Sequence, residues 1–276
     1  MSLRCWPLLT LVFGLPLLVA PPLRAEPERE RERPLVFAHR GASEQSPENT
    51  LASFSLAIES GADGIEVDVR TTRDGHLIVM HDATVDRTTD GSGAVADLSL
   101  EAIRRLDAGT HFHPRFAGQR VPTLREVLEL VGDRADVLLD LKEQGEAYAR
   151  AVADQVRRYG NPDRTIAGVR GVDQAAQFRR LLPMTRQLGF IRNPTDIEPF
   201  VAAGVETIRL WPRWIDSEPR LADRVRRAGA RLHLNGTTGE LAETKRLLAH
   251  RPSSLLVDHP ARLIRSLNTL ADDHDW

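Results

Sequence analysis

Acidic side chains with strand spacing are the first sign of chemistry in this sequence. Glu66 and Asp68 stand two residues apart in an apolar run, so on a strand both project to the same face. Two carboxylates on one buried face repel each other unless a positive charge neutralises them. A hard divalent cation, Ca²⁺ or Mg²⁺, suits such oxygen ligands, and Arg40, Arg70 or Lys142 are the alternative neutralisers.

Two histidines follow apolar runs in the same way and suit proton transfer. His39 and His81 are candidates because neutral imidazole titrates near working pH. Asp140, which closes a later apolar run, is a candidate third metal ligand. Arg40 and Lys142 could hold a phosphate, the arginine bidentately and the lysine as a point charge. Spacing alone leaves a structural role for the histidines and simple ion pairing for the cations equally open.

The elements that must position these residues alternate between short apolar runs and amphipathic stretches. The predicted strands are Leu35–Ala38, Gly64–Val69, Val137–Leu141, Thr165–Gly168, Arg186–Gly189, Thr207–Leu210, Arg231–Leu234 and Ser254–Val257. The predicted helices are Thr50–Ser60, Thr123–Val131, Glu146–Tyr159, Val172–Leu181, Pro194–Ala203, Glu218–Ala228, Glu240–Ala249 and Pro260–Leu270. This count predicts an α/β TIM-type (β/α)₈ barrel. A doubly wound open sheet is the alternative, and the lack of a G-x-G-x-x-G turn after the first strand disfavours it.

In such a barrel the active site forms where the strands end at their carboxyl side. The candidates above lie there, and polar residues follow the later strands as well: Arg209, Trp211, Asn235, Asp258 and His259. Trp211 and Asn235 are therefore possible pocket residues. An insertion after the second strand, about 71–122, holds a short strand, His76–Met80, and a small helix, Leu100–Leu106. Insertions of this kind often cover the site.

Composition and the N-terminal segment limit the classes of protein to which this sequence can belong. The 276 residues are 41% hydrophobic and 28% charged, enough for a sizeable core, and the net charge of −2 gives no basic field for nucleic acid. Residues 1–25 have the pattern of a signal peptide and residues 26–33 that of a charged linker, leaving a catalytic domain at 34–276. We expect a secreted or periplasmic protein without a membrane span in the mature chain. An uncleaved anchor is the alternative, and the sequence does not indicate an oligomeric state.

An ordered series of motifs resembles the glycerophosphodiester phosphodiesterase family. The series runs through AHRGASEQSPENTLASF (38–54), GADGIEVDV (61–69), TRDG (72–75), VMHD (79–82), TDGSG (89–93), PTL (122–124), LDLK (139–142) and, more weakly, LVDHP (256–260). The resemblance covers essentially residues 34–265.

The resemblance implies a TIM-type barrel and metal-dependent hydrolysis of small-molecule glycerophosphodiesters to sn-glycerol 3-phosphate and an alcohol. By the motifs, the catalytic histidines fall on His39 and His81, and the ligands of one divalent cation fall on Glu66, Asp68 and Asp140. The resemblance also implies that the phosphate-binding positions fall on Arg40 and Lys142. The insertion resembles the family's small capping region.

Two departures from the family pattern affect the site. Asp140 stands where the family usually has Glu, and His233 stands where it usually has Trp in a Trp-x-Val-Asn pattern. The shorter side chain of Asp140 is expected to change which metal the site prefers. His233 is expected to change the wall of the pocket that holds the alcohol part of the substrate. Related barrels that cleave lysophospholipid or sphingomyelin head groups in a phospholipase D-like reaction share much of the motif set. They are one functional alternative, and a non-catalytic glycerophosphodiester-binding protein is another.

Overall fold

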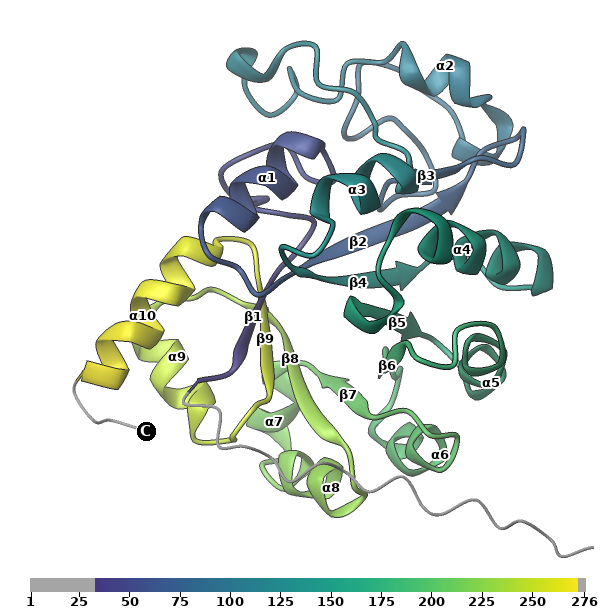
Figure 1. Ribbon diagram of the computed structural model, residues 1–276. Coiled ribbons are helices and arrows are strands. Elements are labelled where there is room, and N and C mark those ends of the chain that lie inside the picture. The colour runs from purple at the N-terminus through teal and green to yellow at the C-terminus, as the bar shows by residue number, and fades with distance from the viewer. Residues whose placement is uncertain (1–32, 273–276) are drawn as a thin grey trace, which may run out of the picture. The chain divides into compact units, whose positions relative to one another are not determined.

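A computed structural model describes residues 33–272, which form a closed ring of strands with helices around it (Figure 1). The strands are β1 (Leu35–Ala38), β2 (Gly64–Thr71), β3 (Leu77–Val79), β4 (Asp136–Leu141), β5 (Thr165–Val169), β6 (Arg186–Gly189), β7 (Thr207–Leu210), β8 (Arg231–Thr237) and β9 (Ser254–Val257). Apart from β3, neighbouring strands pair in parallel, and β1 pairs with both β9 and β2, which closes the ring. The predicted (β/α)₈ barrel is confirmed, and the open sheet is excluded.

Side chains alternate along each strand between the lumen of the barrel and the layer beneath the helices. On β2, Ile65, Val67 and Val69 are fully buried in the main hydrophobic core, which includes apolar residues of the surrounding helices. Glu66 and Asp68 project to the opposite face, because successive side chains of a strand point in opposite directions. A separate apolar cluster that includes Phe37, Leu138 and Leu256 fills the lumen below them.

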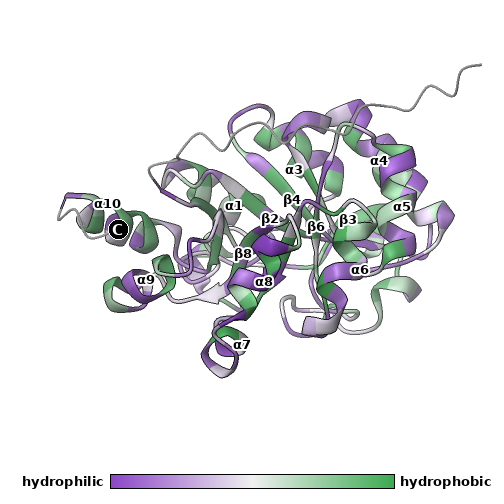
Figure 2. Ribbon diagram, turned by 90° about the horizontal axis from the view of Figure 1, so that it is seen from below, coloured by the Kyte–Doolittle hydropathy of each residue, from purple (hydrophilic) through white to green (hydrophobic). Residues whose placement is uncertain are grey.

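The helices follow the strands in the predicted order. They are α1 (Leu51–Glu59), α2 (Leu100–Arg104), α3 (Leu124–Val131), α4 (Glu146–Tyr159), α5 (Val172–Leu181), α6 (Ile197–Ala202), α7 (Pro212–Ser217), α8 (Leu221–Arg227), α9 (Leu241–Leu248) and α10 (Pro260–Asp272). Hydrophilic and hydrophobic residues alternate around α4, α5 and α6 (Figure 2), as expected of helices packed on a barrel. The predicted helix at 194–203 begins with a 3₁₀ turn at Pro194–Asp196, and α7 was not predicted.

The insertion forms a small unit attached to β2. Its strand β3 pairs antiparallel with the end of β2, with Val69 opposite Val79 and Thr71 opposite Leu77. Seven buried apolar side chains give the unit a core of its own: Ile78, Met80, Val85, Val95, Ile103, Ala108 and Val121. In Figure 1 the insertion, with α2 and β3, lies at the far end of β2. His81 follows β3, so the insertion and the barrel together position it.

The predicted signal peptide, 1–25, and nearly all of the predicted linker, 26–33, lie outside the described residues. Within residues 33–272, none of the helices has the length and apolar content that crossing a membrane requires.

Candidate active site

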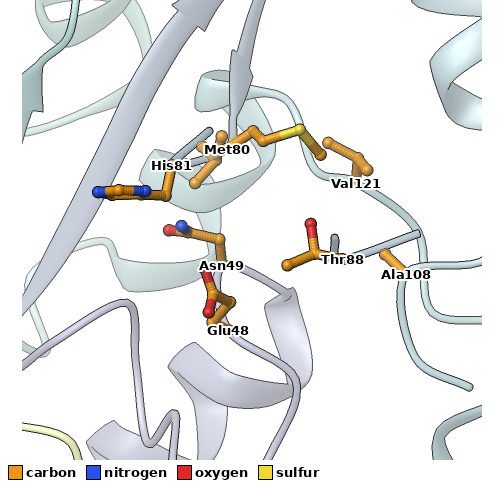
Figure 3. Close-up of a pocket in the computed structure, with 8 residues that line it drawn as sticks. Glu48, Asn49, Met80, His81, Thr88, Ala108 and Val121 are labelled. Carbon is orange, nitrogen blue, oxygen red and sulfur yellow. The ribbon is translucent and has the colours of Figure 1, made fainter. Parts of the chain in front are cut away.

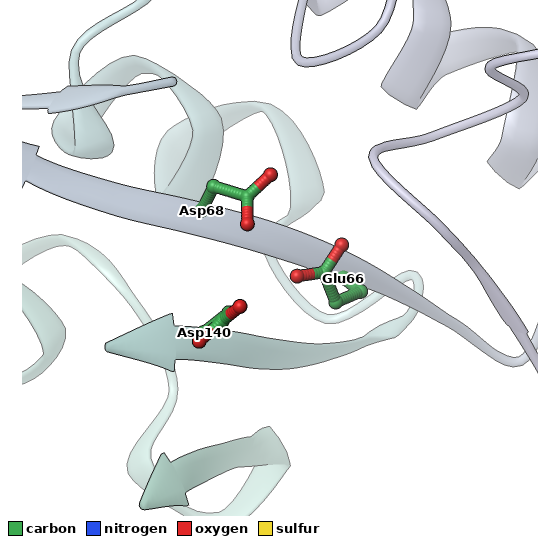
Figure 4. Close-up of side chains that lie close together, drawn as sticks. All are labelled: Glu66, Asp68 and Asp140. Atoms are coloured by element: carbon green, nitrogen blue, oxygen red, sulfur yellow. The ribbon is translucent and has the colours of Figure 1, made fainter. Parts of the chain in front are cut away.

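Three buried carboxylates meet where β2 and β4 run side by side. Asp68 is directly opposite Asp140 in the parallel register, and Glu66 lies two residues before Asp68 on the same face. Each carboxylate offers one oxygen within 4.8 Å of an oxygen of the other two (Figure 4). The side chains are nearly inaccessible, since the exposed fractions of Glu66, Asp68 and Asp140 are 2%, 1% and 6%. The predicted ligand set is therefore brought together.

Asp68 is neutralised by cations that the sequence also singled out. Lys142 Nζ lies 2.7 Å from Asp68 Oδ1, Arg40 Nε lies 3.4 Å from Oδ2, and Asn49 Nδ2 donates to Oδ2 at 2.7 Å. Burial alone would raise the pKa of Asp68, but the charges of Lys142 and Arg40 outweigh burial and hold the pKa at about 2. Arg40 and Lys142 thus contact the carboxylates, while Arg70 donates to the backbone carbonyl of His81 instead.

Glu66 has no cation in such direct contact among the described residues. It accepts a hydrogen bond from the backbone N–H of Arg40 at 3.1 Å, and within residues 33–272 it forms no side-chain ion pair. Burial raises the pKa of Glu66 well above its usual range, with the charges of Asp68 and Asp140 adding to the rise and those of Lys142 and Arg40 opposing it. A cluster of oxygen donors with one buried carboxylate that no cation contacts directly suits a hard divalent cation.

Asp140 has an arginine partner that the sequence did not reveal. Arg170, which follows β5, places Nη2 at 2.5 and 2.6 Å from the two oxygens of Asp140, and Lys142 Nζ lies 2.5 Å from Oδ2. The strand register explains the contact, because Asp140 pairs with Gly168 and Arg170 lies two residues further on the same face. The acid that departs from the family's usual Glu is therefore bound on two sides by cations.

Each candidate histidine has one ring nitrogen bound to a carboxylate. His39 Nδ1 lies 2.7 Å from Oδ1 of Asp258, at the end of β9, and His81 Nδ1 lies 2.7 Å from Oδ1 of Asp82. A carboxylate only accepts, so Nδ1 carries the proton in both rings and Nε2 of the neutral ring is a proton acceptor. Burial lowers the pKa of His81 despite the opposing effect of Asp82, which favours the neutral ring.

A network of ion pairs connects the His81 side of the site to Arg40. Arg87 binds Asp82 Oδ2 through Nε at 2.6 Å and both oxygens of Glu48 at 2.8 Å. Glu48 also accepts from Arg40 Nη1 at 3.0 Å. The network holds Asp82 and Arg40 in place, and it involves Glu48 and Arg87, which sequence reasoning missed.

The loop after β1 has a left-handed backbone that turns Arg40 into the site. Arg40 and Gly41 have φ values of 57° and 84°, and the main-chain carbonyl of Arg40 accepts from Asn49 N at 2.9 Å and Ser53 Oγ at 3.1 Å. These bonds fix the loop against the start of α1. The predicted phosphate-binding position of Arg40 is thus held on both its backbone and its side chain.

A small pocket opens beside His81. Its lining comes from the loop before α1 and from the insertion: Glu48, Asn49, Val79, Met80, His81, Thr88, Ala108 and Val121. Figure 3 shows His81 and Asn49 at one side of this pocket and Ala108 and Val121 at the other. Because Asn49 also binds Asp68, the pocket borders the acidic cluster.

The two predicted pocket residues lie on the opposite side of the lumen. Trp211, at the end of β7, stacks on Arg209 with 4.6 Å from the guanidinium carbon to a ring centroid, and its ring approaches Gly236. Asn235 is buried on β8, with an exposed fraction of 8%. Neither joins the three carboxylates, so their role as pocket residues stays a prediction.

Comparisons with known proteins agree with the fold and with the motif series. The family model of the glycerophosphoryl diester phosphodiesterase family matches residues 39–262. A glycerophosphodiester phosphodiesterase of Caldanaerobacter subterraneus subsp. tengcongensis is 36% identical over 236 residues, which is 83% of this chain and 96% of that protein. The crystal structure of a glycerophosphodiester phosphodiesterase from Agrobacterium tumefaciens superposes with a TM-score of 0.73 at 29% identity, covering 84% of this chain and 100% of the other.

One further structure shares the fold at lower identity. A phosphodiesterase of Oleispira antarctica, solved in complex with the product sn-glycerol-3-phosphate, superposes with a TM-score of 0.78 at 23% identity. The match covers 85% of this chain and 97% of that one. At this identity the likeness concerns the barrel itself.

Proposed function

The chain belongs to the glycerophosphoryl diester phosphodiesterase family, and we propose that it hydrolyses glycerophosphodiesters to sn-glycerol 3-phosphate and an alcohol. The observation that carries the proposal is the pairing of two carboxylate-bound histidines, His39 and His81, with a buried cluster of three carboxylates. The glycerophosphodiester phosphodiesterases named above support the substrate class. The substrate is a small molecule, and neither nucleic acid nor a membrane is part of the proposal.

A divalent cation, Ca²⁺ or Mg²⁺, is the proposed cofactor, held by Glu66, Asp68 and Asp140. Such an ion supplies Lewis-acid polarisation of a phosphoryl oxygen. The burial of Glu66 without a direct ion pair supports this assignment, because an added cation would lower the cost of its burial. Arg170 occupies both oxygens of Asp140, so Asp140 is the ligand with the least free coordination capacity.

The histidines perform the proton transfers in this proposal. One ring, neutral, accepts the proton of the attacking hydroxyl through Nε2, and the other, as the imidazolium, donates its Nε2 proton to the leaving alkoxide. Asp258 and Asp82 hold the two rings in the required tautomer through Nδ1. The attacking hydroxyl belongs either to water or to the glycerol 2-position, and ³¹P NMR distinguishes these routes because only the second forms a cyclic phosphate.

Arg40 and Lys142 bind the phosphoryl group in the proposed complex. Both side chains are mostly buried and adjoin the acidic cluster, so a bound phosphate would lie close to both charges. Fixed cations stabilise the charge that develops on phosphoryl oxygens in the transition state. We also propose a secreted or periplasmic location from the signal-peptide pattern of residues 1–25, which N-terminal sequencing of the exported protein would check.

The proposed function is tested by product release from glycerophosphocholine and glycerophosphoethanolamine, with EDTA and then with Ca²⁺, Mg²⁺ or Mn²⁺. We expect hydrolysis only with a cation, and a loss of at least about 100-fold in rate for His39→Ala and for His81→Ala. The exposed His76 supplies a matched control, His76→Ala. Full activity in either site variant or in EDTA would contradict the mechanism. Binding without turnover would favour a non-catalytic binding protein, and preference for lysolipids or sphingomyelin would favour the phospholipase D-like alternative.

A further inference from the structure

Three arginines pack against aromatic rings around the ends of β5, β6 and β7. Arg170 and Arg209 both approach the ring of Phe190, with guanidinium carbons 5.2 and 5.5 Å from its centroid. Arg213, in α7, lies 4.9 Å from a ring centroid of Trp211, whose other neighbour is Arg209. We call Arg170, Arg209 and Arg213 the basic wall.

Arg209 of the basic wall points into the lumen. Its neighbours on β7, Ile208 and Leu210, are fully buried in the core beneath the helices, so the side chain between them projects inward. Arg209 is opposite His233 on β8, and His233 packs edge-on against the lumenal Phe37. Arg209 therefore shares the lumen with the acidic cluster.

Arg209 has no anionic partner in the described part of the chain. Its exposed fraction is 7%, its Nη2 reaches the carbonyl of Ile191 at 3.4 Å, and its Nε and Nη1 are buried without a hydrogen-bond partner. Burial, together with the charges of Arg170 and Arg213 and against the opposing effect of Asp140, lowers the pKa of Arg209 to about 10. An unpaired buried guanidinium is costly, whereas an anion at its fork would form charge-assisted bonds.

The basic wall and the acidic cluster are continuous, because Arg170 also binds Asp140. A phosphodiester at Lys142 and the carboxylates would therefore have the basic wall beside it. Cationic head groups do not suit this wall. Aromatic faces can bind quaternary ammonium groups, but here the rings of Phe190 and Trp211 already lie against guanidinium groups.

We propose that the basic wall binds a second anionic group on the leaving alcohol, a carboxylate or a phosphate monoester. The preferred substrates are then glycerophosphodiesters whose alcohol part carries its own negative charge. This inference rests on the proposed hydrolytic function and specifies which members of that substrate class the site selects.

The test compares matched substrate pairs that differ by one anionic group. In the first pair, glycerophosphoserine differs from glycerophosphoethanolamine by an added carboxylate. In the second pair, glycerophosphoglycerol is compared with its derivative that carries a phosphate monoester on the terminal hydroxyl. Loss of the diester signal in ³¹P NMR gives kcat/KM for each. We expect the anionic member of at least one pair to be favoured about tenfold or more, as one charge-assisted hydrogen bond provides. The pair that shows the preference identifies the anion.

Arg209→Met is expected to reduce that preference at least about fivefold, because the variant keeps the apolar contacts but loses the guanidinium. Arg227→Met makes the same change at an exposed position of α8 and should leave the preference as in the wild type. The quantity compared is a ratio within one protein, so partial misfolding cancels. A wild-type ratio of one or less in both pairs, or a ratio unchanged in Arg209→Met, would overturn the inference.

Binding measured by calorimetry in EDTA separates this inference from the hydrolytic function. If no diester is consumed with any cation, the proposed hydrolytic function is wrong. Tighter binding of the anionic diester that depends on Arg209 would still support the basic wall as an anion site. Equal binding of both members of each pair, or binding unaffected by Arg209→Met, would refute the anion site in either case.

Discussion

The burial of His233 in the barrel lumen should make the fold less stable as the pH falls into the mildly acidic range. His233 has no exposed surface, its Nδ1 lies 2.7 Å from Ser254 Oγ, and its Nε2 has no partner among the described residues. Burial, with a smaller contribution from the nearby charge of Arg209, lowers the pKa of His233 from 6.5 to about 3. The folded protein therefore excludes a proton that the unfolded chain accepts.

The sign and size of the effect follow from this difference. Because the folded pKa lies below the unfolded value, the stabilisation is present above pH 6.5 and is lost as the pH falls from 6.5 towards 3. Each pH unit in that window costs about 1.4 kcal/mol, so by pH 5 the His233 contribution amounts to about 2 kcal/mol.

The assay is urea denaturation at pH 7 and pH 5 in EDTA, for the wild type and for His233→Gln. The glutamine retains a partner for Ser254 but does not titrate, so the loss of unfolding free energy between the two pH values should be about 2 kcal/mol smaller in the variant. His76→Gln, at an exposed position, should behave as the wild type. Equal pH dependence in the wild type and His233→Gln would refute the reasoning.

Two further perturbations test the loop after β1 and the orientation of a histidine. Gly41→Ala should lower the free energy of unfolding, measured by urea denaturation, by more than about 2 kcal/mol, because φ is +84° and the new Cβ would lie 2.4 Å from an atom of α1. Gly75 is the control, since it has a similar φ of +81° but open space around the added Cβ. An equal loss of stability in Gly75→Ala would contradict the contact argument. Asp258→Asn should lower kcat at least about tenfold by releasing Nδ1 of His39, with a smaller change in KM, and unchanged kcat would exclude the positioning role.

Strand periodicity was enough to predict both the barrel and the acidic pair. The two-residue spacing of Glu66 and Asp68 places both side chains on the same face of a strand, and the alternation of apolar runs with amphipathic stretches predicts the ring. Positions after apolar runs made Asp140, His39 and His81 candidates, and the motif series assigned their roles although they lie far apart in the sequence. The structure brings the three acids together, while the catalytic roles of the histidines stay a prediction.

Contacts that depend on register or on loop conformation could not be predicted. Arg170 reaches Asp140 because β4 and β5 are aligned with Asp140 opposite Gly168, a pairing that the sequence does not encode locally. The spacing is compatible with either ion pairing or phosphate binding by Arg40 and Lys142, and the structure shows both side chains at the carboxylates.

The antiparallel strand β3 has a consequence for how the active site is assembled. His81 is carried by a unit with a separate small core, joined to the ring through the end of β2, through the two bonds from Arg70 to the His81 carbonyl and through the ion pairs of Arg87 with Glu48. Its proposed counterpart, His39, belongs to the ring itself. The two proposed proton-transfer groups therefore lie in the same site only while the insertion is packed against the barrel. A local opening of the insertion, about 50 residues, would abolish activity while the barrel remains folded.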